Sequence, residues 1–168
     1  MILKYLLIPF IFLIPLYCSE AYIETASSTT QIPNLITGSF VLSDSIALIK
    51  HFDINPDKSI FTCKIPGLYL VTDGLQPGAL GSKASGYLDT WFVLNGNPIP
   101  GSNSRQYINQ DVQIALMTNT FLIKLKPGDT FAVKFTASGP DIGLLTIKTQ
   151  TSIEPYILCY GLTMFKIY

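Results

Sequence analysis

The chain has few charged residues and a single histidine. Of its 168 residues, 13% are charged, and the 11 basic residues balance the 11 acidic ones. A nucleic-acid-binding or membrane-surface protein normally carries a basic surplus, which this chain lacks. His51 is the only imidazole, so no second one can share a metal or relay a proton. The composition argues against nucleic-acid binding and against a histidine-based site.

Several other chemical signatures are missing as well. No glycine-rich phosphate loop opens a helix, and no apolar stripe of 3.6-residue period follows the first 21 residues. The sequence has no Asn-x-Ser/Thr acceptor for an N-linked glycan and no Gly-x-y collagen repeat. We therefore expect a non-enzymatic protein without a cofactor.

The first 21 residues have the pattern of a signal peptide. A short basic start with Lys4 precedes an apolar run over residues 5–17, and Ser19-Glu20-Ala21 supplies small residues for cleavage. A membrane anchor needs about 20 apolar residues, and this run is shorter and contains Pro9 and Pro15. We expect cleavage and a secreted or cell-surface protein. A retained anchor is the alternative, and it would be the only contact with a membrane.

The remaining residues predict a leader followed by one domain. Residues 22–38 are rich in serine and threonine and show no core periodicity, so they are interpreted as a leader or linker. Residues 39–168 have a length suited to a single domain with a full apolar core. The low charge combined with 48% apolar residues suggests that part of the surface is hidden in an oligomer.

Short apolar runs separated by Gly, Pro, Asn and Asp indicate an all-β domain. About ten strands fit a β-sandwich of jelly-roll type with two antiparallel sheets. The expected strands are Phe40–Leu42, Ile46–Ile49, Ser59–Lys64, Leu68–Thr72, Tyr87–Leu94, Val112–Met117, Phe121–Leu125, Phe131–Phe135, Leu144–Lys148 and Tyr156–Tyr168.

Three dipeptides predict the positions of sharp turns. Pro66-Gly67 marks a corner between two strands, and Asn95-Gly96 marks a tight turn. Pro127-Gly128 lies between Phe121–Leu125 and Phe131–Phe135, which predicts that these two strands form a hairpin.

One acidic segment and two cysteines each leave two interpretations open. Asp53, Asn55 and Asp57 alternate as in a calcium loop, but they lack the glycine and the distant glutamate of an EF-hand, so a solvated turn is favoured. After cleavage, Cys63 and Cys159 remain. They either form one disulfide in an oxidising compartment or are two buried apolar thiols.

Four segments follow one another in a recognisable order: Phe61 with Gly67 and Tyr69, Val93–Gly101, Leu125–Asp129 and Gly161. With these segments the chain resembles the C1q/TNF-like jelly-roll superfamily, and particularly the bacterial C1q-like heads of BclA exosporium glycoproteins, over roughly residues 40 to 168. Val71 and Asp73 depart from the pattern, because the family usually has aromatic residues there.

The resemblance implies a homotrimer whose subunits meet through an inner sheet. Aromatic side chains of that sheet surround the threefold axis in the family, which would assign Tyr69, Trp91, Phe135 and Tyr160 to the subunit interface. For Phe135 a place in the core of one subunit is an equally good interpretation. The same topology would bring Cys63 close to Cys159, which would allow a disulfide between them.

The resemblance also implies a function. We expect a secreted or surface-displayed trimeric head that binds a protein or a glycan through exposed loops at Gln76–Gly86 and Gly101–Asp111. The alternative is a structural subunit of a surface layer or coat without a soluble ligand.

Overall fold

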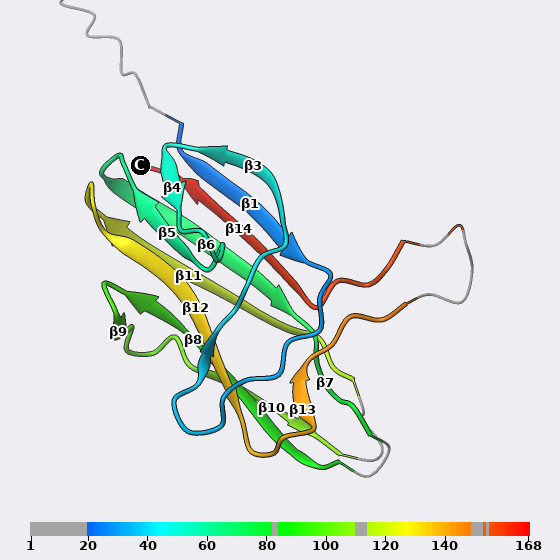
Figure 1. The fold of residues 1–168 in the computed structure, drawn as a ribbon. Coiled ribbons are helices and arrows are strands. Elements are labelled where there is room, and N and C mark those ends of the chain that lie inside the picture. Colours follow the sequence, from blue (N-terminus) through cyan, green and yellow to red (C-terminus); the bar gives the residue numbers. More distant parts are fainter. Residues whose placement is uncertain (1–19, 82–83, 110–113, 149–152, 154) are drawn as a thin grey trace, which may run out of the picture.

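The fold is an all-β sandwich, as the sequence predicts. In this computed structural model, the described residues are 20–81, 84–109, 114–148, 153 and 155–168, so most of the expected signal peptide lies outside them. They form 14 strands in three antiparallel sheets (Figure 1). Among these residues, no helix has the length and apolar character needed to cross a membrane.

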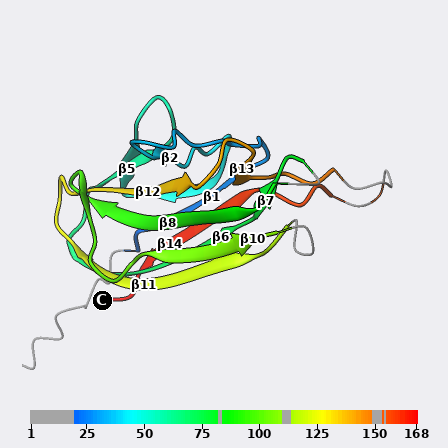
Figure 2. The same ribbon diagram turned by 90° about the horizontal axis from the view of Figure 1, so that it is seen from below.

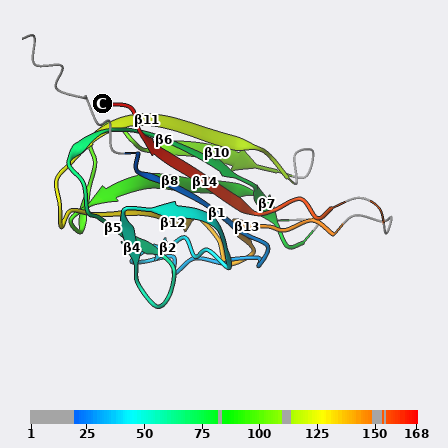
Figure 3. The same ribbon diagram turned by 90° about the horizontal axis from the view of Figure 1, so that it is seen from above.

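Two large sheets make the sandwich, and they lie in stacked layers when viewed from below and from above (Figures 2 and 3). The five-stranded sheet has the order β11 (Met117–Leu125), β6 (Gly67–Leu75), β14 (Tyr160–Lys166), β1 (Tyr22–Ser27) and β3 (Ser45–Lys50).

The seven-stranded sheet forms the other layer. Its main path is β10 (Ser104–Ile108), β8 (Gly86–Leu94), β12 (Thr130–Ala137), β5 (Ile60–Cys63) and β4 (Phe52–Ile54). Two short strands lie off this path: β2 (Ser39–Phe40) pairs with β12, and β9 (Asn97–Pro98) pairs with β8. A separate pair, β7 (Pro77–Ala79) and β13 (Ile142–Leu144), lies at the end of the sandwich near the chain that leads into β14 (Figure 1).

Alternating side chains build the core between the two layers. In β6, Tyr69, Val71, Asp73 and Leu75 point inward and are 0% exposed, while their neighbours point outward. Aromatic rings from the other sheet pack against this layer, and Phe92 and Phe131 lie 5.4 Å apart between ring centroids. Burial of these large side chains supplies the main favourable free energy of folding.

The segment interpreted as the start of a leader is instead a strand inside a sheet. Residues 22–27 form β1, which pairs with β14 on one side and β3 on the other. The sequence obscures this strand because only Ile23 is a large inward apolar side chain; Thr25 and Ser27 are also buried there. The Thr25 hydroxyl donates a hydrogen bond of 2.6 Å to the Ser45 carbonyl oxygen, which satisfies this buried polar group.

The predicted hairpin around Pro127-Gly128 is wrong, although its turn is present. Gly128 has a φ of 89°, and the Asp129 amide donates to the Lys126 carbonyl oxygen at 3.0 Å. The flanking strands do not pair, however, because β11 lies in the five-stranded sheet and β12 in the seven-stranded sheet. A turn motif fixes only a local reversal of the chain. Which sheet each flanking strand joins depends on where its apolar side chains pack in the folded domain.

The other turns agree with the sequence, but several strand bounds do not. Asn95 and Gly96 both have positive φ and join β8 to β9, and the Pro66-Gly67 corner joins β5 to β6. The predicted last strand is shorter than expected and begins at Tyr160. The two predicted binding loops contain strands β7 and β10 together with residues outside the described ones.

Candidate binding surfaces

Three of the four residues predicted at a subunit interface lie inside the single chain. Tyr69, Phe135 and Tyr160 are 0, 1 and 2% exposed, so their rings fill the core between the sheets. Trp91 points outward from β8 and is partly buried, and a Cβ at Gly38 would lie 3.2 Å from its ring. These positions correct the expected interface, because a ring packed in the core of one subunit cannot contact another.

The predicted disulfide between Cys63 and Cys159 is absent, and both thiols are free and buried. Cys63 ends β5 in the seven-stranded sheet, with its sulfur 3.5 Å from the Tyr69 hydroxyl oxygen. Cys159 immediately precedes Tyr160, which pairs with Leu75 at the far end of β6. Six residues of extended strand separate Tyr69 from Leu75, or about 20 Å. A disulfide requires Cα atoms within about 7 Å.

Each thiol instead occupies its own polar niche. Cys63 donates to the Ile65 carbonyl oxygen at 3.0 Å, and the Cys159 sulfur lies 3.1 Å from the Thr29 carbonyl oxygen. Burial raises the pKa of the Cys159 thiol, which keeps it protonated and unreactive at neutral pH.

We expect a reductant to leave the thermal unfolding midpoint unchanged. A thiol reagent should modify Cys63 and Cys159 only after denaturation, because both side chains are shielded by the folded chain. Peptide mapping after labelling in native and denaturing buffer measures this. A lower midpoint in reductant, together with a linked pair of peptides, would contradict the free-thiol state.

The acidic segment predicted as a turn or a calcium loop is a structured turn. The Asn55 side-chain oxygen accepts hydrogen bonds from the Ser59 and Ile60 amides at 2.8 and 2.9 Å. Asp53 forms an ion pair with Lys64 at 2.5 Å, so two of the three proposed ligands already have partners in the chain. Among the described residues, no group of three or more His, Cys, Asp or Glu side chains could hold a metal ion.

An apolar row crosses the side of the five-stranded sheet that faces away from the core, here called the open face. The row is formed by side chains that stand opposite one another in four neighbouring strands: Leu122, Leu70, Phe165 and Tyr22. Leu122 is 53% exposed and Phe165 is 42% exposed, which is unusual for adjacent large apolar side chains.

The rest of the open face has small side chains and few charges. The next row places Thr120, Thr72 and Thr163 opposite one another and ends at Glu24. One row further, Gly74 and Gly161 stand side by side, and nothing lies within 4 Å of a Cβ built on either glycine. Small and uncharged side chains let another surface approach the backbone closely.

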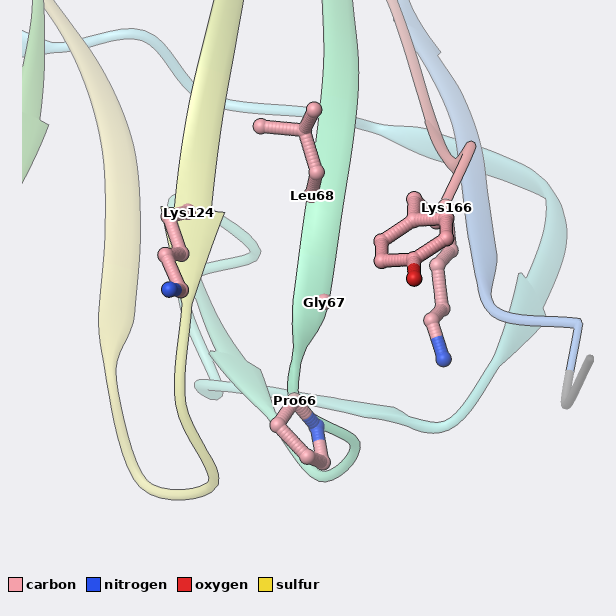
Figure 4. A pocket seen from close by; sticks show the side chains of 6 residues that line it. Pro66, Gly67, Leu68, Lys124 and Lys166 are labelled. Carbon is pink, nitrogen blue, oxygen red and sulfur yellow. The ribbon is translucent and has the colours of Figure 1, made fainter.

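A groove of about 530 Å³ lies at one end of the open face, beside the Pro66-Gly67 corner. Its floor is the start of β6, and Figure 4 shows Lys124 on one side of Gly67 and Lys166 on the other. Leu68 and Tyr168 complete its apolar part, and the Leu68 amide donates to the Tyr168 carbonyl oxygen at 2.8 Å.

The outward side of the seven-stranded sheet carries a cluster of a different kind. Arg105 forms two hydrogen bonds to Asp89, of 2.7 and 2.6 Å, and its guanidinium lies 3.7 Å from the centre of the Tyr87 ring. Tyr107 packs edge-on against Tyr87 and is 63% exposed. Arginine and tyrosine are enriched at the centres of protein interfaces, so this cluster is a candidate contact surface.

One carboxyl group is buried inside the sandwich without full pairing. Asp73 is 0% exposed; one oxygen accepts two hydrogen bonds from Asn119, and the other has no partner among the described residues. Burial raises the pKa of Asp73 to about 6, although the Asn119 hydrogen bonds act in the opposite direction. Sequence analysis identified Asp73 only as a departure from an aromatic position.

The solved structures contain a close match to this architecture. The globular domain of zebrafish complement 1qA protein superposes with a TM-score of 0.59, covering 89% of this chain and 98% of that chain. The fold is C1q-like. The two sequences are 15% identical, so the likeness concerns the fold. No protein-family model and no curated protein matches the sequence.

The C1q-like fold agrees with the fold that the sequence resemblance implies. The proximity to bacterial BclA heads stays a prediction. The sequence-based prediction did not include the open face. The resemblance points to aromatic residues such as Tyr69, which is buried in β6, whereas Leu68 and Leu70 form the alternate, outward set of that strand. A strand with large apolar residues at successive positions is the signal that both of its faces are covered.

Proposed function

We propose that this chain is a secreted or surface-displayed, non-enzymatic head that trimerises through its open face and binds a protein or glycan. The apolar row of Leu122, Leu70, Phe165 and Tyr22 carries this proposal, because such a row is costly to leave in water. The C1q-like fold supports it, since the superfamily resemblance implies trimeric binding heads.

The second copy is the occupant that best fits the open face. Its rows of threonine and glycine are flat and nearly uncharged, which suits close packing against an equally flat apolar surface. A cyclic trimer needs contacts between two different patches of each subunit. The row supplies them, because Leu122 lies on the edge strand β11 and Tyr22 lies three strands away on β1.

Ligand contacts would then fall on the surfaces that the trimer leaves free. The Tyr87, Tyr107 and Arg105 cluster lies on the outward side of the seven-stranded sheet, on the opposite layer from the open face. Of the two segments expected to present the ligand surface, Gln76–Gly86 ends directly before Tyr87, and Gly101–Asp111 contains Arg105 and Tyr107.

Light scattering coupled to size exclusion tests the assembly. We expect a mass three times that of one chain at micromolar concentration and at both low and high salt, because the contact is apolar. A single-chain mass at tens of micromolar would overturn the trimer.

A binding screen against glycans and extracellular proteins, run on the sample whose mass was measured, tests the role. Saturable binding by the trimer supports the head. A trimer that binds none of them but associates laterally into sheets would instead support the alternative, a structural subunit of a surface layer or coat.

A further inference from the structure

The groove at the end of the open face combines two free positive charges with an apolar floor. Lys124 extends from β11 and Lys166 from β14, and neither forms an ion pair with any described residue. No aspartate or glutamate side chain lines the groove. Two ammonium groups beside one cavity attract a negatively charged ligand group.

Apart from the Tyr168 hydroxyl, the remaining groove surface offers a ligand almost no hydrogen bonds. The Leu68 amide is already bonded to Tyr168, and the Ile167 amide donates to the Leu68 carbonyl oxygen at 2.8 Å. Pro66 has no amide hydrogen, and Leu68 contributes only aliphatic carbon. The part of a ligand that lies along this floor must therefore be apolar.

The size of the groove suits a small molecule. Its volume of about 530 Å³ falls within the range of ordinary small-molecule pockets, roughly 300–1,000 Å³. Its lining ends at Leu68 and includes neither Leu70 nor Leu122, so the groove lies beside the apolar row and not within it. All of the lining belongs to one chain, so the groove needs no second copy.

From these features we infer that the groove binds an aliphatic carboxylate. The ammonium groups of Lys124 and Lys166, which line the groove on either side of Gly67, attract the carboxylate, and the hydrocarbon chain lies along Leu68 beside Tyr168. Binding joins a charge-assisted contact to burial of apolar surface. This site goes beyond the trimeric binding head and does not depend on it.

Calorimetric titration of the full chain with decanoate, below its micelle concentration, tests the inference. We expect saturable binding at one site per chain. Decanol, which has the chain without the charge, and acetate, which has the charge without the chain, should each bind at least about ten-fold more weakly. Decanol binding as tightly as decanoate, or decanoate failing to saturate, would overturn the site.

Matched variants distinguish an effect of Lys124 and Lys166 on decanoate binding from an effect of the net charge of the chain. Lys124→Gln with Lys166→Gln should weaken decanoate binding by about ten-fold or more, a loss of one to two charge-assisted contacts. Lys126→Gln with Lys148→Gln removes the same charge outside the groove and should leave binding unchanged. Lys124→Arg with Lys166→Arg keeps both charges and should retain binding, which guards against a folding defect in the glutamine pair.

Equal affinity of the glutamine pair and the native chain would contradict the inference. The mass of every sample is measured in parallel, so the two proposals fail separately. A monomer that binds decanoate would support the groove and contradict the trimer. A trimer that does not bind decanoate would support the trimer and contradict the groove.

Discussion

Raising the pH from about 4.5 to 7.5 is expected to destabilise the folded chain by about 2 kcal/mol through Asp73 alone. Burial raises the pKa of this carboxyl from 3.8 to about 6. Between these two values the folded chain binds a proton that the unfolded chain releases. The stabilisation is therefore fully present below pH 3.8 and is lost as the pH rises through 6.

The physical cause is the poor pairing of the ionised form. Asn119 donates two hydrogen bonds to one carboxylate oxygen, at 3.1 and 2.8 Å, and the other oxygen is buried without a partner. Tyr160 packs close by, and its own pKa is raised well above 10 by burial first and by the Asp73 charge second. It stays neutral in this pH range and does not compensate the carboxylate.

Urea unfolding at several pH values measures the effect. Asp73→Asn should flatten the pH dependence between 4.5 and 7.5, because the amide does not ionise. Asp141→Asn, at an exposed carboxylate, should preserve it. The lowered pKa values of Asp44 and Asp129 act only below pH 3.8, outside this window. A native chain that gains stability as the pH rises through 6 would contradict this role of Asp73.

Leu70→Asp is expected to convert the trimer to monomers while the sandwich stays folded. Leu70 lies in the middle of the apolar row, on the outward side of β6, so the substitution leaves the core unchanged. In the trimer it would bury one unpaired carboxylate per subunit, which should raise the dissociation constant by about a hundred-fold or more. Light scattering gives the mass, and circular dichroism confirms the fold.

Tyr107→Asp is the matched control for this substitution. Tyr107 is 63% exposed and lies on β10, in the other sheet, so the same new charge is placed on a surface that the proposed trimer leaves free. We expect this variant to remain trimeric. The opposite pattern, with Tyr107→Asp monomeric and Leu70→Asp trimeric, would move the interface to the seven-stranded sheet.

The sequence by itself determined the fold class and the positions of several turns. Short apolar runs and the absence of a helical period indicated an all-β sandwich, which the C1q-like architecture confirms. The turns at Asn95-Gly96 and Pro127-Gly128 were located correctly, because the positive φ of Asn95, Gly96 and Gly128 is a local property of those residues. The segment from Phe61 to Tyr69 likewise gave both the corner and a resemblance that implies the observed fold.

Only the tertiary structure decided which strands pair and which faces are covered. Sheet membership separates β11 from β12 across a tight turn. It also places Cys63 beside Tyr69 and Cys159 beside Leu75, at opposite ends of β6. Pairing with β14 and β3 holds strand β1 in the sheet. Its small polar side chains do not form the apolar alternation by which a strand is recognised in a sequence. Alternation in a strand defines two faces, but the partner sheet decides which of them becomes the core. That choice buries Tyr69 and places half-buried Leu70 on the open face, and so moves the candidate interface by one residue.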